Sequence, residues 1–185
     1  MTEKEKMLKG LMYNANNNEE INKDRAKART LCYEFNKLHP NKLETEGVNI
    51  IKELFNKTGG KIWIEAPIRC DYGYNIEVGE NFYCNYNCTI LDVNKVVFGN
   101  NVFIGPNCSF YTALHPLDAD ERNEGLEYAK PITIGDNVWF GGSVTVLPGV
   151  TIGSNSVIGA GSVVTKDIPE CVVAVGNPCK VIKEI

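Results

Sequence analysis

The chain has 185 residues, enough for about one domain with an appendage, and its 43% hydrophobic content is that of an ordinary globular protein. The formal net charge of −4 gives no support to a nucleic-acid-binding role. The N-terminus lacks the apolar stretch of a signal peptide, and no run approaches the roughly 18 apolar residues of a membrane span. We therefore expect a cytoplasmic protein that binds neither nucleic acid nor a membrane.

Residues 1–60 are rich in Lys, Glu, Asn and Leu and lack the repeat that follows them. The spacing of apolar residues predicts a helix from Asn22 to Leu38, which ends at His39, and a second helix from Val48 to Phe55. A shorter helix is expected from Glu3 to Met12. The buried face of the longest helix is expected to carry Ala26, Leu31, Phe35 and Leu38. This region either closes the open end of the repeat domain or forms part of a substrate site.

From residue 61 onward the chain repeats every six residues. The apolar anchors of the repeat are Val78, Cys84, Ile90, Phe98, Ile104 and Phe110, followed later by Ile134, Phe140, Val146, Ile152, Ile158 and Val164. Six residues suit one short strand and one turn, and side chains two apart on a strand share a face. One repeat cannot bury its own apolar face, so repeats must stack. The pattern predicts a mainly β solenoid over residues 61–185, with three hexads in each triangular coil.

Three hexads per coil place every third anchor on the same face. Face A carries Val78, Phe98, Ile134 and Ile152; face B carries Cys84, Ile104, Phe140 and Ile158; face C carries Ile90, Phe110, Val146 and Val164. Asparagine often stands three residues after an anchor, and it tolerates the left-handed backbone angles of tight turns. These positions are Asn81, Asn87, Asn101, Asn107, Asn137 and Asn155.

The corner after face B is almost free of side chains in its later coils. Its residues there are Gly105, Pro106, Gly141, Gly142, Gly159 and Ala160. This column either accommodates a linear ligand along the axis or simply suits a tight corner. Asn85 interrupts the glycine column, and Trp139 points outward from the same face. An outward tryptophan marks either a subunit interface or a ligand contact.

Seven cysteines are present without a CxxC motif. An odd number of cysteines without metal-ligand spacing argues against both a disulfide framework and a zinc site, so we expect no bound metal. Cys84, Cys88 and Cys108 fall on inward positions of the repeat, where a thiol acts as a small hydrophobic side chain.

Residues 112–131 break the count of six with a long polar excursion, and such excursions from a regular scaffold are often functional. His115 lies on it, and a neutral imidazole is the natural general base near neutral pH, although a lone histidine can also be incidental. His39, at a helix end, is interpreted as structural. Asp92 shares the corner of His115 and is either an acceptor-orienting carboxylate or a solvated turn residue. Because Asn85 lies at a different corner, a shared small site requires a packed neighbour or a long reach by the excursion. We therefore expect a symmetric oligomer with sites between subunits.

Six stretches of the sequence resemble one known family. They are RCDYGYN from Arg69, FYCNYNCTILDV from Phe82, YTALHP from Tyr111, PITIGDNVWFGG from Pro131, PGVTIGSNSVIGAGSVVTKDIP from Pro148 and GNPCKVI from Gly176. Together with the N-terminal helical region they resemble the hexapeptide-repeat acyltransferases, specifically the maltose and galactoside O-acetyltransferases, over essentially the whole chain. Val93 stands where the galactoside branch tends to have a second aspartate, so the maltose branch is nearer.

The resemblance implies a left-handed parallel β-helix, although ordinary crossover rules favour the opposite hand. It also implies a homotrimer with active sites in the clefts between subunits. The implied donor is acetyl-CoA, as a co-substrate rather than a permanently bound cofactor. The implied acceptor is a sugar hydroxyl, typically the 6-hydroxyl of a glucosyl or galactosyl unit.

The family pattern also assigns roles by position. His115 matches the general base, and Asn85 matches the family's site asparagine. Gly142 is expected to offer its N–H to the developing oxyanion. The expected acetyl-CoA contacts are Trp139, Gly142, Ala160, Thr165, Lys166, Lys180 and Lys183. The expected acceptor contacts are Asp71, Asp92 and Glu127. Of these, Glu127, like Ala15, replaces a residue that contacts sugar in the galactoside branch.

Other activities stay open at this point. The same chemistry on galactosides, serine or an antibiotic is an alternative, and a non-catalytic solenoid scaffold is an alternative outside the enzyme class. A γ-type carbonic anhydrase shares the architecture but needs three histidine ligands, whereas this chain has two histidines in total.

Overall fold

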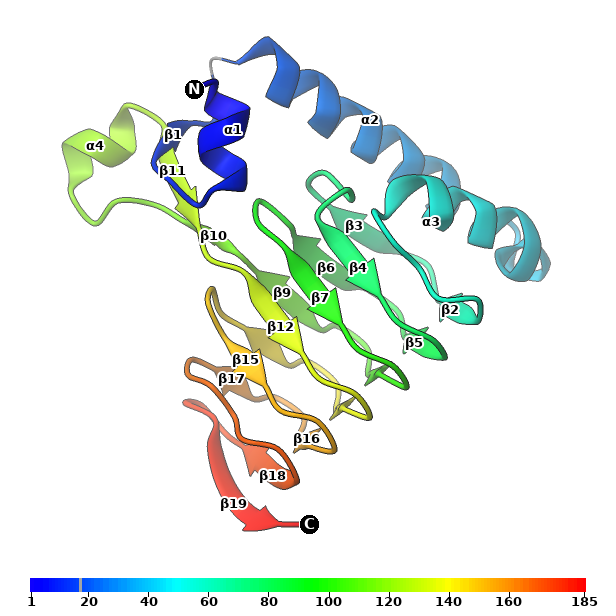
Figure 1. Cartoon of the computed structure of the whole chain (residues 1–185). Coiled ribbons are helices and arrows are strands. Elements are labelled where there is room, and N and C mark those ends of the chain that lie inside the picture. The colour runs from blue at the N-terminus through cyan, green and yellow to red at the C-terminus, as the bar shows by residue number, and fades with distance from the viewer. Residues whose placement is uncertain (17) are drawn as a thin grey trace.

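A computed structural model describes residues 1–16 and 18–185. In the described residues, the β-rich part is a three-sided solenoid of stacked coils, with helices at one end (Figure 1). Face A holds β4 (Ile76–Val78), β7 (Val96–Phe98), β12 (Ile132–Ile134) and β15 (Thr151–Ile152). Face B holds β2 (Ile62–Ile64), β5 (Phe82–Cys84), β8 (Phe103–Ile104), β13 (Trp139–Phe140), β16 (Val157–Ile158), β18 (Val172–Val175) and β19 (Lys180–Glu184). Face C holds β3 (Ile68–Cys70), β6 (Cys88–Leu91), β9 (Ser109–Tyr111), β14 (Thr145–Val146) and β17 (Val163–Val164).

Adjacent strands on each face pair in parallel and in register, apart from the antiparallel pairing of β18 with β19. The predicted columns are confirmed by the partners of three anchors: Ile134 pairs with Phe98 and Ile152, Phe140 with Ile104 and Ile158, and Val146 with Phe110 and Val164. All of these anchors are buried. The phenyl rings of Phe98, Phe110 and Phe140 stack edge to face inside the solenoid, with centroid separations of 4.9 and 5.4 Å. The mainly β solenoid predicted by the hexads is therefore confirmed.

The turn asparagines form ladders that run along the solenoid axis. All six predicted positions have positive φ, between 55° and 63°. The side-chain amide of Asn81 donates to Asn101, that of Asn101 to Asn137 and that of Asn137 to Asn155, at 2.9–3.0 Å. A second ladder joins Asn87 to Asn107 at 3.1 Å. Asparagine thus supplies both the left-handed backbone angle and a hydrogen bond from coil to coil.

The corner glycines are explained by the close stacking of the coils. A Cβ atom on Gly141 would lie 2.6 Å from the backbone nitrogen of Ala160, and one on Gly105 would lie 2.7 Å from that of Gly142. Gly79, at the corner after face A, is equally restricted, since its Cβ would lie 2.5 Å from the carbonyl oxygen of Gly99. The glycine column after face B therefore has a packing explanation and does not by itself indicate a ligand track.

The N-terminal region contains α1 (Glu3–Leu8), α2 (Glu19–Asn36) and α3 (Val48–Leu54), with short turns of 3₁₀ helix at Pro40–Lys42 and π helix at Leu43–Gly47. Helix α2 begins three residues before the predicted start because the Asn18 side chain caps the N–H of Ile21 at 3.0 Å. Helix α1 ends four residues early because the chain turns at Gly10, whose φ is +68°. No helix in the described ranges is long and apolar enough to cross a membrane.

Helices α2 and α3 cover the first coil of the solenoid. Ala28, Leu31 and Phe35 join the same buried cluster as the strand anchors. The expected placement of Ala26 on the buried face was wrong, because Ala26 is exposed and Ala28 lies inward instead. Covering the first coil shields strand edges that would otherwise be free to pair with other chains.

The excursion, residues 112–131, contains regular secondary structure and is not simply a polar loop. It contains β10 (Ala113–Leu114), α4 (Ala119–Asn123) and β11 (Leu126–Ala129). Strand β11 lies between β10 and the N-terminal strand β1 (Tyr13–Asn14), antiparallel to both. Figure 1 shows this small sheet standing out from the solenoid beside α1. The excursion therefore brings residue 115 close to the N-terminal region.

Two replacements of Asn137 separate the contribution of its left-handed backbone angle to stability from that of its side-chain hydrogen bonds. Asn137→Ala removes two ladder hydrogen bonds and puts a Cβ-bearing residue at a left-handed angle, so we expect the free energy of unfolding to fall by about 2–3 kcal/mol. Asn137→Gly removes the same bonds but tolerates the angle, so we expect a loss of about 1 kcal/mol. Urea denaturation beside the parent protein measures both. Equal losses would show that the backbone angle contributes nothing.

Candidate active site

One cavity collects three of the polar residues that the sequence singled out, namely Asp71, His115 and Glu127. It has a volume of about 230 Å³, and its walls include Ala15, Arg25, Arg29, Asp71, His115 and Glu127. These residues come from the N-terminal segment, α2, the turn after β3 and the excursion. We call it the histidine cavity. It has the convergent polar groups of a small-molecule site.

His115 directly follows β10, and the neighbouring strand of the excursion orients its ring. The Nδ1 atom lies 3.1 Å from the carbonyl oxygen of Leu126 in β11. A carbonyl oxygen can only accept a hydrogen bond, so the proton of the neutral ring lies on Nδ1. The Nε2 atom then carries the free lone pair, which is the arrangement that a general base requires.

Glu127 belongs to β11 and is buried beside His115. The hydroxyl group of Tyr13 donates a hydrogen bond of 2.9 Å to its Oε1 atom. Burial raises the pKa of Glu127 above its ordinary value, against the opposing effect of the hydrogen bond from Tyr13. The carboxyl group is thus held in place from the N-terminal strand.

Arg25 reaches the cavity from α2. Its Nη2 atom donates to the hydroxyl oxygen of Tyr72 at 2.9 Å, and its guanidinium group lies 5.6 Å from the centroid of that ring. Burial raises the pKa of Asp71, while the nearby charges of Arg25 and Arg29 lower it. Carboxyl and guanidinium groups therefore face one small cavity, which suits a ligand with several hydroxyl groups.

Asp92 does not line the cavity, contrary to the expectation that it contacts an acceptor. Its exposed fraction is 0%. Its Oδ1 atom accepts the backbone N–H groups of Asp71 at 3.0 Å and Tyr72 at 2.9 Å, and Oδ2 accepts that of Asn75 at 3.4 Å. The carboxylate turns inward because these N–H groups of the turn after β3 need an acceptor. Asp92 therefore fixes the turn that carries Asp71.

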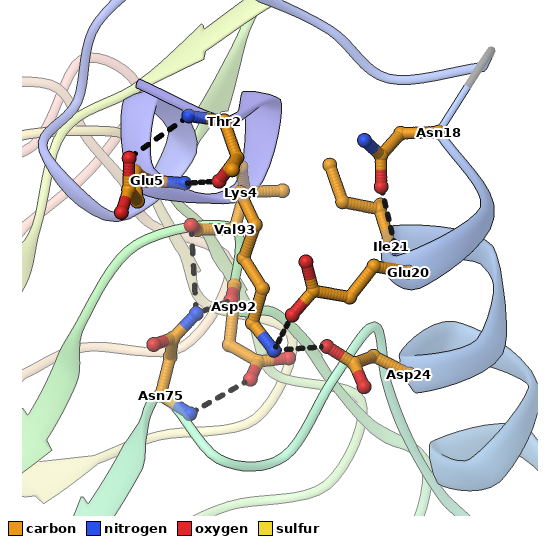
Figure 2. A network of polar contacts seen from close by, with 10 residues as sticks. All are labelled: Thr2, Lys4, Glu5, Asn18, Glu20, Ile21, Asp24, Asn75, Asp92 and Val93. Atoms are coloured by element: carbon orange, nitrogen blue, oxygen red, sulfur yellow. Dashed lines mark hydrogen bonds and ion pairs between the residues drawn. The ribbon is translucent and has the colours of Figure 1, made fainter.

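Figure 2 shows the contacts of Asp92 with this turn beside those between α1 and α2. The side chain of Asn75 returns a hydrogen bond of 2.7 Å to the backbone oxygen of Asp92. In the same view, the Lys4 ammonium group of α1 lies 3.0 Å from Glu20 and 2.7 Å from Asp24 of α2. These contacts hold α1 against α2, the helix that supplies Arg25.

Asn85 and Trp139 lie together in a different cavity, on face B. Its volume is about 370 Å³, and Tyr83, Phe103 and Gly105 also line it. Trp139 is 57% exposed. The side-chain oxygen of Asn85 accepts the N–H of Tyr86 at 2.8 Å. Within one chain, Asn85 and His115 therefore line separate cavities, as the triangular frame predicts.

The remaining donor candidates lie on the surface of the later coils. The Gly142 carbonyl accepts the N–H of Gly161 at 2.9 Å, whereas its own N–H has no hydrogen-bond partner among the described residues. The other candidates are all exposed: Ala160, Thr165, Lys166, Lys180 and Lys183. The two last lie on β19, opposite β18. Within one chain these residues do not share a cavity with His115.

Sequence reasoning missed three contributors to the histidine cavity. Arg25 and Arg29 stand in a charged helix segment that reads as a solvated face. Tyr13 has no local signal, because its contact with Glu127 depends on the pairing of β1 with β11. Within the described residues, no group of three or more His, Cys, Asp or Glu side chains could hold a metal ion.

Stability should depend on the protonation of Asp92. Burial, aided by the charge of Asp71, raises its pKa from 3.8 to about 7 against the backbone N–H groups of Tyr72 and Asp71. The folded protein then binds the proton more tightly than the unfolded chain, so this stabilisation is complete below about pH 4 and is lost as the pH rises to about 7. Between pH 4 and pH 7 we expect the free energy of unfolding of the parent protein to fall by a few kcal/mol for this reason, and that of Asp92→Asn not to show this fall. Urea titrations from pH 4 to pH 7 measure it, and identical pH dependence in both proteins would contradict the raised pKa.

Comparison with known proteins gives consistent matches along the chain. The maltose acetyltransferase hexapeptide capping motif matches residues 6–59, and the bacterial transferase hexapeptide family, six repeats, matches residues 131–166. A protein of Saccharomyces cerevisiae named as an acetyltransferase is 52% identical, covering 98% of this chain and 92% of its own length. One of Staphylococcus aureus, also named as an acetyltransferase, is 54% identical over 100% of this chain and 92% of its own.

Solved structures match equally well. A maltose O-acetyltransferase from Clostridium difficile 630 is 56% identical, with a TM-score of 0.97 over 100% of this chain and 98% of its own. A galactoside acetyltransferase in complex with coenzyme A is 47% identical, with a TM-score of 0.95 over 100% and 92%. A Vibrio cholerae hexapeptide-repeat acetyltransferase complexed with acetyl-CoA is 38% identical, with a TM-score of 0.91 over 100% and 98%. The left-handed parallel β-helix expected from the resemblance is confirmed. The chain therefore belongs to the hexapeptide-repeat acetyltransferases, in the group with the maltose acetyltransferase capping motif, and is an enzyme of that class.

Proposed function

We propose that this protein transfers the acetyl group of acetyl-CoA to a hydroxyl group of a glucose- or maltose-type sugar, typically the 6-hydroxyl. One observation carries the proposal: His115, with Nδ1 directed to the carbonyl of Leu126, lines a cavity that also holds carboxyl and guanidinium groups. Hydroxyl-rich ligands are recognised by such groups, because each hydroxyl both donates and accepts hydrogen bonds. The likeness to a maltose O-acetyltransferase supports the choice of acceptor.

Asp71, Glu127 and Arg25 are the acceptor contacts in this proposal. The two carboxyl groups accept hydrogen bonds from sugar hydroxyls, and the guanidinium group donates them. Asp92 acts indirectly by fixing the turn of Asp71. Val93 is buried, and it stands where the galactoside branch tends to have a second aspartate, so a glucosyl acceptor is favoured over a galactoside.

The chemistry is a direct transfer without an acyl-enzyme. Nε2 of His115 takes the proton of the sugar hydroxyl as its oxygen attacks the thioester carbonyl. The N–H of Gly142 stabilises the negative oxygen of the tetrahedral intermediate. The carbon–sulfur bond then breaks, and the CoA sulfur leaves with the proton that His115 had taken. The products are the acetylated sugar and free CoA.

The donor lies along face B in this proposal. Trp139 and the corner residues Gly142 and Ala160 meet the pantetheine arm, while Thr165, Lys166, Lys180 and Lys183 meet the remainder of CoA and its phosphates. Lysine supplies charge but not the two-pronged hydrogen bonding of arginine. The solved relatives with coenzyme A and acetyl-CoA support the choice of donor.

A complete site needs a second copy of the chain. His115 and Asn85 line different cavities in one chain, so we propose a homotrimer in which Asn85 of one subunit faces His115 of the next. In each subunit, residues 1–60 form the helical region and residues 61–185 form the acyltransferase domain. We place the enzyme in the cytoplasm, where acetyl-CoA is made and used.

Removing the base should abolish most of the transfer. We expect His115→Ala to lower kcat by about 100-fold or more, measured as release of the CoA thiol with maltose or glucose as acceptor. His39→Ala is the matched control, because the His39 side chain accepts the N–H of Asn41 at the start of the 3₁₀ turn Pro40–Lys42, and its replacement should leave kcat unchanged. Unchanged turnover in His115→Ala would remove His115 from the mechanism.

The acceptor is tested with a panel of hydroxyl compounds: glucose, maltose, a galactoside, serine and chloramphenicol. We expect the highest kcat/KM for glucose or maltose. Activity confined to serine or chloramphenicol would exclude the sugar assignment, and no turnover with glucose, maltose or the galactoside would contradict it.

Mixing two inactive variants tests the shared site. A mixed trimer of His115→Ala and Asn85→Ala subunits contains one site with both residues intact, so random mixing should restore about a quarter of the parent activity. The proteins are unfolded, mixed and refolded together, and each variant refolded alone is the control. Activity no higher than that of the separate variants would place His115 and Asn85 in one subunit's site.

A further inference from the structure

Two cysteines outside the histidine cavity lie in contact. Cys32 of α2 and Cys70 of β3 are both buried, and their Sγ atoms are 3.7 Å apart. They are 38 residues apart in the sequence and belong to different elements. Both line a second, larger cavity of about 590 Å³ between α2 and face C. On the wall of this cavity Cys32 and Cys70 keep exposed fractions of 6% and 8%.

The surroundings of the two thiols make them unequal. The same cavity is lined by three basic residues, Arg29, Lys37 and Arg69, and by one acidic residue, Asp71, so positive charges outnumber negative ones there. A hydrogen bond from Cys70, with a smaller contribution from Arg69, lowers the pKa of Cys32 despite burial. The same hydrogen bond and burial raise the pKa of Cys70. Cys32 is thus the more acidic of the two thiols and forms the nucleophilic thiolate more readily than Cys70 does.

We propose that Cys32 and Cys70 form a modification site at which hydroperoxides produce an intrachain disulfide between α2 and β3. The Cys32 thiolate attacks one peroxide oxygen, the O–O bond breaks, and a sulfenic acid forms with release of hydroxide. The sulfur of Cys70 attacks the sulfenic sulfur, and a second hydroxide leaves. The thiol protons convert both hydroxides to water, so two thiols and hydrogen peroxide give a disulfide and two waters. A dithiol reductant reverses the change.

A disulfide between Cys32 and Cys70 would affect the stability of the protein because of where it lies. Cys70 immediately precedes Asp71, and α2 also carries Arg25 and Arg29. A bond between α2 and β3 joins two walls of the histidine cavity and closes a long loop of the unfolded chain. We therefore expect it to raise the thermal unfolding midpoint.

The solenoid contains a matched control. Cys84 and Cys88 also interact through their side chains, but both are fully buried and neither lines the cavity of Cys32 and Cys70. Because peroxide cannot reach the buried thiols of Cys84 and Cys88, we expect this pair to stay reduced even though the two side chains interact. A comparison of the two pairs in one protein separates accessibility from mere proximity.

The experiment treats the whole protein with a small excess of hydrogen peroxide. Unreduced peptides are then mapped by mass spectrometry, and thermal unfolding is recorded before and after. We expect a peptide linked through Cys32 and Cys70, reversal by dithiothreitol, unmodified Cys84 and Cys88, and a midpoint raised by roughly 5–10 °C. In Cys32→Ser and in Cys70→Ser, peroxide should not raise the midpoint, whereas Cys84→Ser should respond like the parent.

Other results would overturn the proposal. Absence of the linked peptide, or equal oxidation of Cys84 and Cys88, would show that the cavity does not select Cys32 and Cys70. A linked peptide without a rise in the midpoint would contradict the stapling of α2 to β3. The mapping uses the parent protein, so its result does not depend on the folding of the variants.

Discussion

In-register stacking of the coils is the constraint on which the rest of this structure depends. Each interior strand of a face pairs with the strands before and after it along the axis, so its anchor lies directly beside its counterparts, as Phe140 does beside Ile104 and Ile158. A slip of one residue would turn the buried residues of a strand toward solvent. The same spacing leaves no room for a Cβ at Gly141 and requires left-handed angles at the turn asparagines. Repetition thus accounts for the residue types at the anchors, the corners and the turns of the solenoid.

A structure that repeats so strictly collects its chemistry where the repeat is interrupted. The excursion supplies His115 and Glu127, the helical region supplies Arg25, and the turn after β3 supplies Asp71. Each group is held by a contact from another segment: Leu126 orients His115, Tyr13 holds Glu127, and Asp92 fixes the turn of Asp71. The regular faces offer long, nearly uniform surfaces instead, which suit an extended donor such as CoA.

The fold could be predicted from the sequence because its signal is local and repeated. Each hexad repeats the same pattern of apolar residues, and every third hexad lies on the same face of the solenoid. The excursion could not be predicted in the same way, because β11 pairs with β1 across 114 residues, as the contact of Tyr13 with Glu127 illustrates. Asp92 was misplaced for a related reason: its burial depends on unpaired N–H groups in a turn some 20 residues earlier. His115 was found because it lies on the one long interruption of the repeat, whereas Arg25 lay in an ordinary charged helix.

The central claim is that the reacting groups come from two copies of this solenoid. A crystal structure of the protein with bound coenzyme A tests it most directly. We expect a trimer in which CoA lies along face B beside Gly142 and Ala160. Its sulfur atom should lie near Asn85 of one subunit and point to Nε2 of His115 in the adjacent subunit. A CoA molecule bound entirely within one subunit, or with its sulfur remote from every His115, would contradict the account.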